Sequence, residues 1–504
     1  MGNVRWLCTR SSAPVPPHFG GHEGPASASI AGGVVDVKAV PDSHDPPIKA
    51  SAGAPWGFSG YSLFTYLVLC DTMFKSVIFI LLGIEYSLCW NGFSEIRDDQ
   101  TLDVKQLFKD LKFSLDFGLF TNTGVTNDIQ LYKSGLANED IHLNISQLIR
   151  KYGNSVEEHE VKTKDGYYLT LIRIPGKGPA VMLMHGLLGS SDDWVVGGTK
   201  SGLAYLLANE GYDVWMGNAR GNKHSRKHET LLPSAPEFWN FSWDEIGRYD
   251  LPASIDYVLD VTNQTKLHYV GHSQGCTVVM VMCSELPKYN DKLSLIIAMA
   301  PPAAIPNIKN PFLNFLKYLT LFRPEMLFSV VKEMGVYEFT PSINLMKTFA
   351  SDMCGKEALA EIVCGNLQFI VCGFNAAQLN VTNLPVIFSH APAGAATKQI
   401  EHFSQSVMSG KFRMFDYGEA RNWKLYGGKE PPEYRLESIT APLAIFYSDN
   451  DWLVAMEDVQ VLRDRLPKVV DFYMLPGFNH VDYLFAKDFK DLIFVRLVSL
   501  LKKY

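Results

Sequence analysis

From about residue 144 onward, short apolar runs of strand length alternate with helix-length stretches along the chain. The apolar runs lie at Ala180–Met184, Tyr212–Met216, Leu267–Val270 and Leu293–Met299, and later at Leu443–Tyr447 and Asp471–Leu475. Stretches with helical periodicity separate them, as at 202–209 and 251–259. Runs that are apolar throughout are typical of strands buried on both faces. The pattern therefore predicts an α/β fold with a mostly parallel sheet covered by helices on both faces.

Three further elements extend this pattern: alternating strands at 158–162 and 167–174, and a closing amphipathic helix at 488–501. Residues 301–438 interrupt the alternation between two predicted strands of the sheet. This segment is rich in Phe, Leu and Met and mostly helical in period. We therefore expect an α/β core at 141–300 and 439–504, with a mainly helical cap or lid inserted at 301–438.

The N-terminal part differs in composition from the rest of the chain. Residues 1–72 are rich in Pro, Gly, Ala and Ser without any period, which predicts disorder. A basic start at Met73, an apolar run and small residues near position 90 predict a signal peptide at 73–90, followed by an N-terminal extension at 91–140. Residues 1–72 would then come from an upstream start or a misdrawn gene model. A signal anchor and a genuine cytoplasmic tail are the alternatives.

A signal peptide beginning at Met73 predicts a protein that is secreted or lysosomal. Charged residues interrupt the apolar stretch around the signal peptide, so we expect no transmembrane span in the mature protein. Four N-x-[ST] sequons fit passage through the secretory pathway and predict glycosylation at Asn144, Asn240, Asn263 and Asn380.

Composition and charge exclude several classes of protein. The 504 residues are 47% hydrophobic and 20% charged, which is ordinary for a globular protein. A formal net charge of −7 without a long basic run argues against a nucleic-acid partner. The 13 histidines are scattered, without a H-E-x-x-H or paired C-x-x-C motif, so we expect no metal site and no cofactor.

Eight cysteines in a chain of this length do not form a disulfide scaffold. Cys276 and Cys283 lie in an apolar helical stretch, where small buried hydrophobes are expected. Cys354 and Cys364 delimit a short loop that suits a disulfide in a secreted protein, and this pairing leaves Cys372 free.

The stretch around Ser273 carries the first chemical signal. Gly271 and Gly275 flank the serine in the pattern G-x-S-x-G, between an apolar strand and a helix that Pro287 ends. Glycines are needed because side chains two residues either side of so tight a turn would clash. Ser273 is then a candidate nucleophile, and the backbone N–H of Gln274 at the helix start is a candidate oxyanion donor.

A serine nucleophile needs a base and a carboxylate that orients the base. On a doubly wound sheet these groups follow in the order Ser, Asp, His, each in a loop after a strand. His480 follows the last predicted strand and is the candidate base. Asp451 follows the strand before it and is the candidate carboxylate, with Asp449 in the same loop as the alternative.

A second oxyanion donor is expected from an early loop. His185-Gly186-Leu187-Leu188-Gly189 directly follows the predicted strand Ala180–Met184, where an H-G motif of this kind belongs. We assign the backbone N–H of Leu187 as the partner of Gln274.

With these stretches in place, the chain resembles the animal acid lipase family, which includes gastric lipase, lysosomal acid lipase and insect gut lipases. The matching stretches include NISQLIRKYG at 144–153, HGLLGSSDDW at 185–194, GYDVWMGNARGN at 211–222, LHYVGHSQG at 267–275, VCGFN at 371–375, SHAPAG at 389–394 and FNHVDYLFA at 478–486. The resemblance covers about residues 141–504. Cys276 stands where a threonine is usual, and SDNDWL replaces a G-x-D-L-L-like stretch.

The resemblance implies an α/β-hydrolase fold and a serine ester hydrolase of lipids, either a triacylglycerol lipase or a sterol ester lipase. It implies the triad Ser273, Asp451 and His480, and a cap disulfide between Cys354 and Cys364. The expected partners are a lipid ester substrate and the lipid–water interface, which apolar cap residues such as Phe315 and Leu316 would contact. A lipid acyltransferase and a non-catalytic lipid-binding protein on the same fold are the alternatives.

Overall fold

The structure is a computed structural model, and it describes residues 130–131, 134–310, 324–339, 372–373, 375 and 377–504. Several sequence predictions therefore fall outside the described residues. They are the disorder of residues 1–72, the signal peptide at 73–90, most of the extension at 91–140, the disulfide of Cys354 with Cys364, and the interfacial role of Phe315 and Leu316.

The described residues form a nine-stranded sheet in the order β1-β2-β4-β3-β6-β7-β10-β11, with β5 paired to β2. The strands are β1 (Glu157–Lys162), β2 (Tyr167–Ile174), β3 (Ala180–Met184), β4 (Asp213–Met216), β5 (Lys227–His228), β6 (Leu267–His272), β7 (Leu293–Met299), β10 (Leu443–Tyr447) and β11 (Val469–Met474). β2 is antiparallel to its neighbours, and the ladders from β4 to β11 are parallel. The predicted mostly parallel sheet is confirmed.

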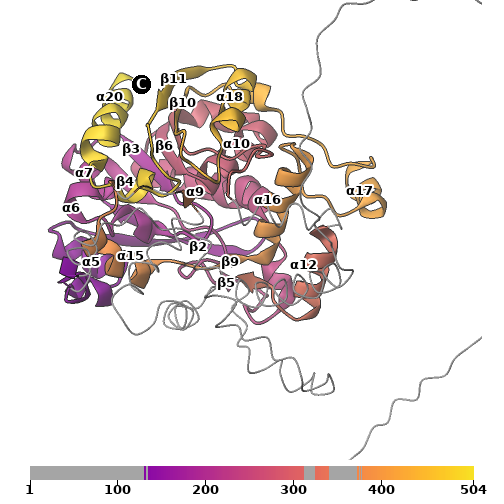
Figure 1. Ribbon diagram of the computed structural model, residues 1–504, viewed down its shortest axis with the longest axis horizontal. Helices are drawn as coiled ribbons and strands as arrows, with labels where there is room; N and C mark the ends of the chain where they lie inside the picture. Colours follow the sequence, from indigo (N-terminus) through magenta and orange to yellow (C-terminus); the bar gives the residue numbers. More distant parts are fainter. Residues whose placement is uncertain (1–129, 132–133, 311–323, 340–371, 374, 376) are drawn as a thin grey trace, which may run out of the picture. The chain divides into compact units, whose positions relative to one another are not determined.

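Helices cover both faces of this sheet. Those before β10 in the core are α5 (Ile145–Lys151), α6 (Gly198–Ser201), α7 (Leu203–Asn209), α8 (Trp243–Glu245), α9 (Leu251–Thr262) and α10 (Gln274–Glu285). Those after it are α18 (Met456–Arg465), α19 (Asp482–Phe485) and α20 (Val495–Lys503). Figure 1 shows α7 and α20 on one side of the sheet and α9, α10 and α18 on the other.

Strand residues alternate between the two cores because successive side chains point to opposite faces. Tyr269 of β6 packs with Val258 of α9 and Val279 of α10 in one core, whereas Val270 packs with Leu206 of α7 and Leu497 of α20 in the other. The strands β3, β4 and β6 are buried over their whole length, while β1 and β11, at the two ends of the strand order, are partly exposed. Burial on both faces explains why the central runs are apolar throughout.

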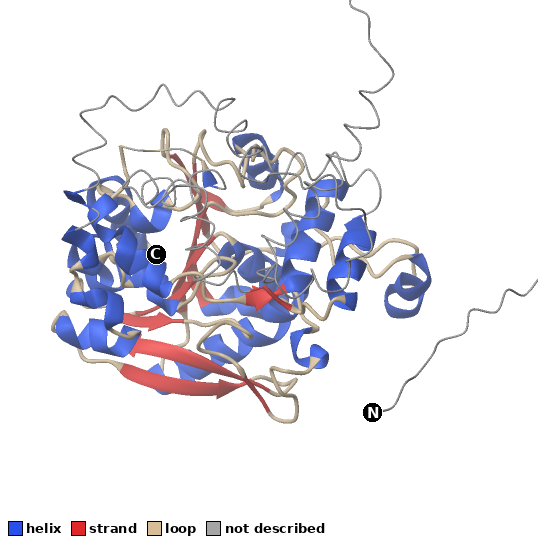
Figure 2. Ribbon diagram, turned by 60° about the horizontal axis from the view of Figure 1, so that its bottom comes forward, coloured by secondary structure: helices blue, strands red, loops and turns tan. Residues whose placement is uncertain are grey.

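Where the structure describes it, the chain between β7 and β10 forms helices and one short strand ladder joined by irregular segments. It holds α12 (Pro324–Glu333), α15 (Leu384–His390), α16 (Thr397–Ser409), α17 (Glu419–Tyr426) and the short ladder of β8 (Glu338–Phe339) with β9 (Ala395–Ala396). Figure 2 shows these strands as separate from the long strands of the central sheet. The boundaries of the cap at 301–438 remain a prediction.

Candidate active site

Ser273 lies at a sharp turn between β6 and α10. Its backbone has φ 52° and ψ −122°, a strained conformation for a residue with a side chain. A Cβ atom on Gly275 would lie 2.2 Å from the carbonyl oxygen of Met184, and one on Gly271 would lie 2.8 Å from the carbonyl carbon of Gly275. A side chain at either position would therefore clash with the backbone, which explains the two glycines. Ser273 stays partly exposed while both of its neighbours in the chain are buried.

His480 joins Ser273 to a buried carboxylate. Its Nε2 lies 2.8 Å from Ser273 Oγ, and its Nδ1 lies 2.8 Å from Asp451 Oδ2. An ionised carboxylate only accepts, so Nδ1 carries the hydrogen and Nε2 is left to accept the hydroxyl proton. The structure thus brings together three side chains from the loops after β6, β10 and β11.

The two candidate carboxylates differ in their surroundings. Asp451 is 1% exposed, and its Oδ1 accepts the backbone N–H groups of Leu453 and Val454 at 2.9 Å each, which leaves Oδ2 for His480. Asp449 is exposed, and its Oδ1 accepts the N–H of Gly477 at 2.7 Å. Asp451 is therefore the carboxylate that binds the His480 imidazole, whereas Asp449 links the loop after β10 to the loop after β11.

The loop after β3 lies directly against Ser273. A Cβ atom on Gly186 would lie 3.0 Å from Ser273 Cβ, a tight contact that glycine avoids. His185 Nδ1 donates to the Gly186 carbonyl at 2.7 Å. Because the C=O and N–H of a trans peptide point in opposite directions, this bond turns the N–H of Leu187 away from His185. Within the described part of the chain, the N–H groups of Leu187 and Gln274 have no hydrogen-bond acceptor.

Comparison with known proteins places the chain in a family. Residues 179–327 match the alpha/beta hydrolase fold, and residues 145–198 match the partial alpha/beta-hydrolase lipase region. The chain is 42% identical over 370 residues to Lipase 1 of Drosophila melanogaster, covering 72% of this chain and 81% of that protein. It is 36% identical to the human lysosomal acid lipase/cholesteryl ester hydrolase, covering 72% and 92%, and 38% identical to the gastric triacylglycerol lipase of Bos taurus, again covering 72% and 92%. The chain belongs to the animal acid lipase family.

The buried groups around the site have shifted pKa values in this member of the acid lipase family. Burial lowers the pKa of His185 to about 4 and that of His272, next to Ser273, to about 3, so both imidazoles stay neutral in mildly acidic solution. Burial raises the pKa of Asp482 to about 7, against hydrogen bonds from Asn479 and Asn375 that lower it.

Sequence reasoning missed several residues around the triad. Asp482 Oδ2 accepts from the N–H of Asn479 and from Asn375 Nδ2, each at 2.8 Å. In the inserted segment, Gln399 Oε1 accepts from Gln274 Nε2 at 2.7 Å. The stretches VCGFN and FNHVDYLFA mark the neighbourhoods of Asn375 and Asp482, but no spacing rule pairs residues 107 positions apart.

The remaining sequence predictions are distributed as follows. Cys276, Cys283 and Cys372 are buried free thiols. Burial was expected for Cys276 and Cys283, and a free thiol was expected for Cys372. The four sequon asparagines, Asn144, Asn240, Asn263 and Asn380, are all exposed, and their glycosylation remains a prediction. In the described part of the chain, no three His, Cys, Asp or Glu side chains are grouped to hold a metal ion, and no helix is long and apolar enough to cross a membrane.

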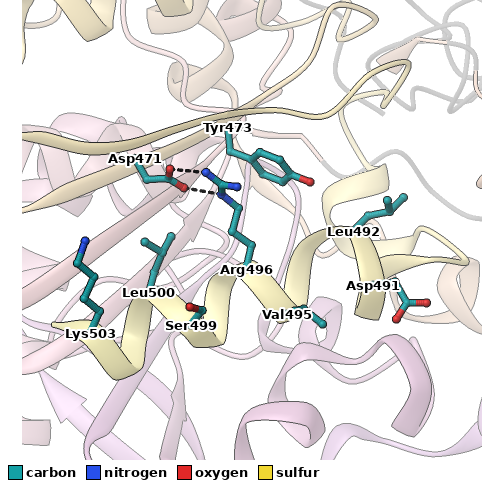
Figure 3. Close-up of a pocket in the computed structure, with 9 residues that line it drawn as sticks. All are labelled: Asp471, Tyr473, Asp491, Leu492, Val495, Arg496, Ser499, Leu500 and Lys503. Atoms are coloured by element: carbon teal, nitrogen blue, oxygen red, sulfur yellow. Dashed lines mark hydrogen bonds and ion pairs between the residues drawn. The ribbon is translucent and has the colours of Figure 1, made fainter.

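A surface hollow of about 470 Å³ lies between β11 and α20 and contains none of these residues. Figure 3 shows Arg496 reaching across it to Asp471, with Nε and Nη2 bonded to the two carboxylate oxygens at 2.8 and 2.6 Å. The guanidinium also lies 4.2 Å from the centre of the Tyr473 ring. Arg496 and Asp471 are thus paired with each other, and the hollow lies apart from the Ser273, His480 and Asp451 side chains.

Proposed function

We propose that the chain is a serine ester hydrolase of lipids, a carboxylic ester hydrolase that acts through an acyl-enzyme. The observation that carries the proposal is the continuous hydrogen-bond chain from Ser273 Oγ through His480 to Asp451, with 2.8 Å at each step. Membership of the acid lipase family supports it. Nucleophile, base and carboxylate in this order are what ester cleavage by a serine requires.

In the proposed mechanism, Ser273 Oγ attacks the ester carbonyl while His480 Nε2 takes its proton. The oxyanion accepts hydrogen bonds from the backbone N–H groups of Leu187 and Gln274, the second of which lies at the positive end of α10. His480 then gives the proton to the leaving alkoxide, and the alcohol departs. A water molecule, deprotonated by His480, then attacks the acyl carbonyl. The bond to Ser273 Oγ breaks, His480 returns the proton to Oγ, and the fatty acid leaves. Asp451 stabilises the imidazolium in both steps.

The substrate class follows from the relatives. Gastric triacylglycerol lipase and lysosomal acid lipase/cholesteryl ester hydrolase are named for neutral lipid esters. We propose a triacylglycerol or a sterol ester for this chain. Long acyl chains suit an apolar cap, because each buried methylene contributes about 0.8 kcal/mol of transfer free energy.

The alternatives to hydrolysis are a lipid acyltransferase and a non-catalytic lipid-binding protein. A fluorophosphonate probe reacts only with an activated serine, so we expect it to label the wild type and Ser273→Ala to lose the label. Ser499→Ala, which removes an exposed hydroxyl on α20, is the matched control and should keep the label. An unlabelled wild type would support the lipid-binding protein. Transfer of acyl groups to glycerol in preference to water would support the transferase.

The lipid–water interface is the proposed partner, and α17 is its proposed contact. Trp423 and Leu425 on this helix are each 57% exposed. At the base of the helix, buried Asn422 donates to Asp416 Oδ1 at 2.8 Å and to the Lys429 carbonyl at 2.9 Å. The helix is thus held firmly while its apolar side chains face outward, as in helices that lie on lipid surfaces.

The proposed location is the secretory pathway, as a secreted or lysosomal protein. It rests on the predicted signal peptide at Met73 and on the names of the relatives, one of which is a lysosomal lipase. Sequencing the N-terminus of the exported protein tests the proposal, and a mature chain that begins before residue 73 contradicts it.

A further inference from the structure

The main chain of His480 is held from both sides. On one side, His272 Nε2 lies 2.7 Å from the His480 carbonyl oxygen. On the other side, the His480 N–H donates to the Cys372 carbonyl at 3.0 Å, and the same carbonyl accepts the N–H of Trp452, next to Asp451, at 3.3 Å. Two hydrogen bonds to its main chain, one at the carbonyl and one at the N–H, therefore hold His480. The imidazole of this residue must reach both Ser273 and Asp451.

The bond from His272 has a defined direction. A carbonyl oxygen only accepts, so the imidazole must carry its hydrogen on Nε2. His272 is 4% exposed, and burial together with the nearby His480 lowers its pKa to about 3. The ring is therefore a neutral N–H donor across the pH range in which a lipase works. The ring centres of His272 and His480 are 5.1 Å apart. Because the His480 imidazole becomes cationic during the reaction, a neutral His272 avoids placing a second positive charge beside it.

The other ring nitrogen confirms how closely His272 is fitted. A Cβ atom on Gly186 would lie 3.2 Å from His272 Nδ1, so the oxyanion loop packs against this nitrogen. Within the described residues, Nδ1 has no hydrogen-bond partner. One imidazole thus touches the loop of the base through Nε2 and the loop of the oxyanion donor through Nδ1.

We propose that His272 is a positioning residue for the reaction: its Nε2–H holds the His480 carbonyl and so directs the His480 imidazole at Ser273. This inference rests on the proposed hydrolase function. The loop that carries His480 turns at Gly477, which has φ 72°, and without the His272 bond only the Cys372 carbonyl holds its main chain at this residue. A displacement of the base by about 1 Å costs on the order of a hundredfold in rate.

If His272 only filled space in the core, substitutions would have a different effect. His272 is surrounded by the rings of His480 and Tyr483, so an apolar residue of similar size would satisfy a packing role. Glutamine would fill the space less well, but its side-chain amide offers an N–H donor at a similar reach. The order of activity between a glutamine and a leucine variant therefore separates positioning from packing.

The experiment compares His272→Gln with His272→Leu in the full chain on a short soluble ester, p-nitrophenyl butyrate. We expect His272→Leu to lower kcat by about ten- to a hundredfold with KM within about twofold of wild type, because alignment and not binding is lost. His272→Gln should keep kcat within about threefold of wild type. Equal losses in both variants, or full activity in His272→Leu, would overturn the proposal.

Folding is checked by the thermal midpoint of each variant. If His272→Leu does not fold, His272→Met replaces it, because methionine adapts to irregular gaps and also lacks a donor. The outcomes also separate this inference from the proposed function. A wild type that neither hydrolyses the ester nor reacts with a fluorophosphonate refutes the hydrolase, whereas an active wild type with an equally active leucine variant refutes only the role of His272.

Discussion

Two carboxylates in one short loop have opposite surroundings, and this difference sets their chemistry. Asp451 is buried, with both oxygens occupied by N–H donors from Leu453, Val454 and His480. Asp449 is exposed and bonded to a backbone amide. A buried carboxylate with fixed donors can hold the imidazole in one tautomer, whereas an exposed one cannot.

We expect Asp451→Asn to lower kcat by about 10⁴-fold, because an amide N–H facing His480 Nδ1 favours the wrong tautomer. Asp449→Asn keeps an oxygen that can accept the Gly477 N–H, so its kcat should stay within about threefold of wild type. Steady-state hydrolysis of a soluble ester measures both. A comparable loss in the two variants would contradict the assignment of Asp451.

Residue types and their order along the chain were sufficient to select Ser273, Asp451 and His480 as candidates. The order Ser, Asp, His follows from where parallel strands end, which hydrophobic patterning reveals. The partners of these residues could not be selected in this way. Gln399 and Asn375 meet the site through contacts across more than 100 positions, and such contacts depend on how the cap folds onto the sheet.

At the scale of single elements, α17 differs from α16 in where its large aromatic side chain lies. α16 stacks His402 on Trp243 with the ring centres 3.5 Å apart, and its Phe403 packs partly buried against the core. On α17 Trp423 and Leu425 are exposed beside the charged Glu419, Arg421 and Lys424, while the buried Asn422 is polar. We propose that the two apolar side chains enter a lipid surface.

We expect the double substitution Trp423→Ser with Leu425→Ser to weaken adsorption to a triacylglycerol emulsion about tenfold. The estimate assumes about 1.5 kcal/mol from two partly inserted side chains. Hydrolysis of a soluble ester should be unchanged, because neither residue contacts the triad. Val461→Ser on α18 is the control, since Val461 is 59% exposed and apolar but lies on a helix of the core. Equal adsorption of the double variant and wild type would rule out α17 as the contact.

The limits of the central strands were predicted closely, whereas the closing helix differs from its prediction in helix type. Predicted and observed limits agree within two residues for the central strands, since a strand buried on both faces must be apolar over its full length. The closing helix was expected at 488–501 as one element, but it begins as a π-helix at Lys490–Phe494 and continues as α20 to Lys503. Periodicity alone does not distinguish the two hydrogen-bond patterns over a single turn.

At the scale of the whole molecule, a buried cluster around Asp192 ties the inserted segment to the core. Asp192 is 1% exposed, and it accepts from His224 Nε2 and His390 Nδ1 at 2.7 Å each and from Lys223 Nζ at 2.5 Å. Lys223 also donates to the His390 carbonyl at 2.7 Å. The loop after β3 joins the same assembly, because the Leu188 carbonyl accepts the N–H of Ala393 at 2.7 Å. The inserted segment and the loop that carries Leu187, the proposed oxyanion donor, are therefore positioned together.

The ionised carboxylate of Asp192 should itself contribute stability at both pH 5 and pH 7.5, although burial and the charge of Asp192 raise the pKa of its neighbour Asp193 to about 7. Burial alone would raise the pKa of Asp192, but the hydrogen bonds from His224 and His390 and the charge of Lys223 bring it well below its usual range. A carboxyl whose pKa is lower in the folded state contributes stability above its unfolded pKa of about 3.9, and that stability is lost only as the pH falls through the lowered value. Both test conditions lie above this window.

We therefore expect Asp192→Asn to reduce the free energy of unfolding by about 3 kcal/mol at both pH values. Breaking a buried ion pair costs about 3–5 kcal/mol, and the lower figure applies because the Lys223 side chain is 32% exposed. Urea unfolding at each pH measures the loss. Asp464→Asn is the control, because the Asp464 side chain is 67% exposed and a surface pair of this kind contributes at most about 1 kcal/mol. A loss seen only at pH 7.5 would mean that Asp192 is protonated at pH 5, and the ion-pair account of how the cap is held would then be wrong.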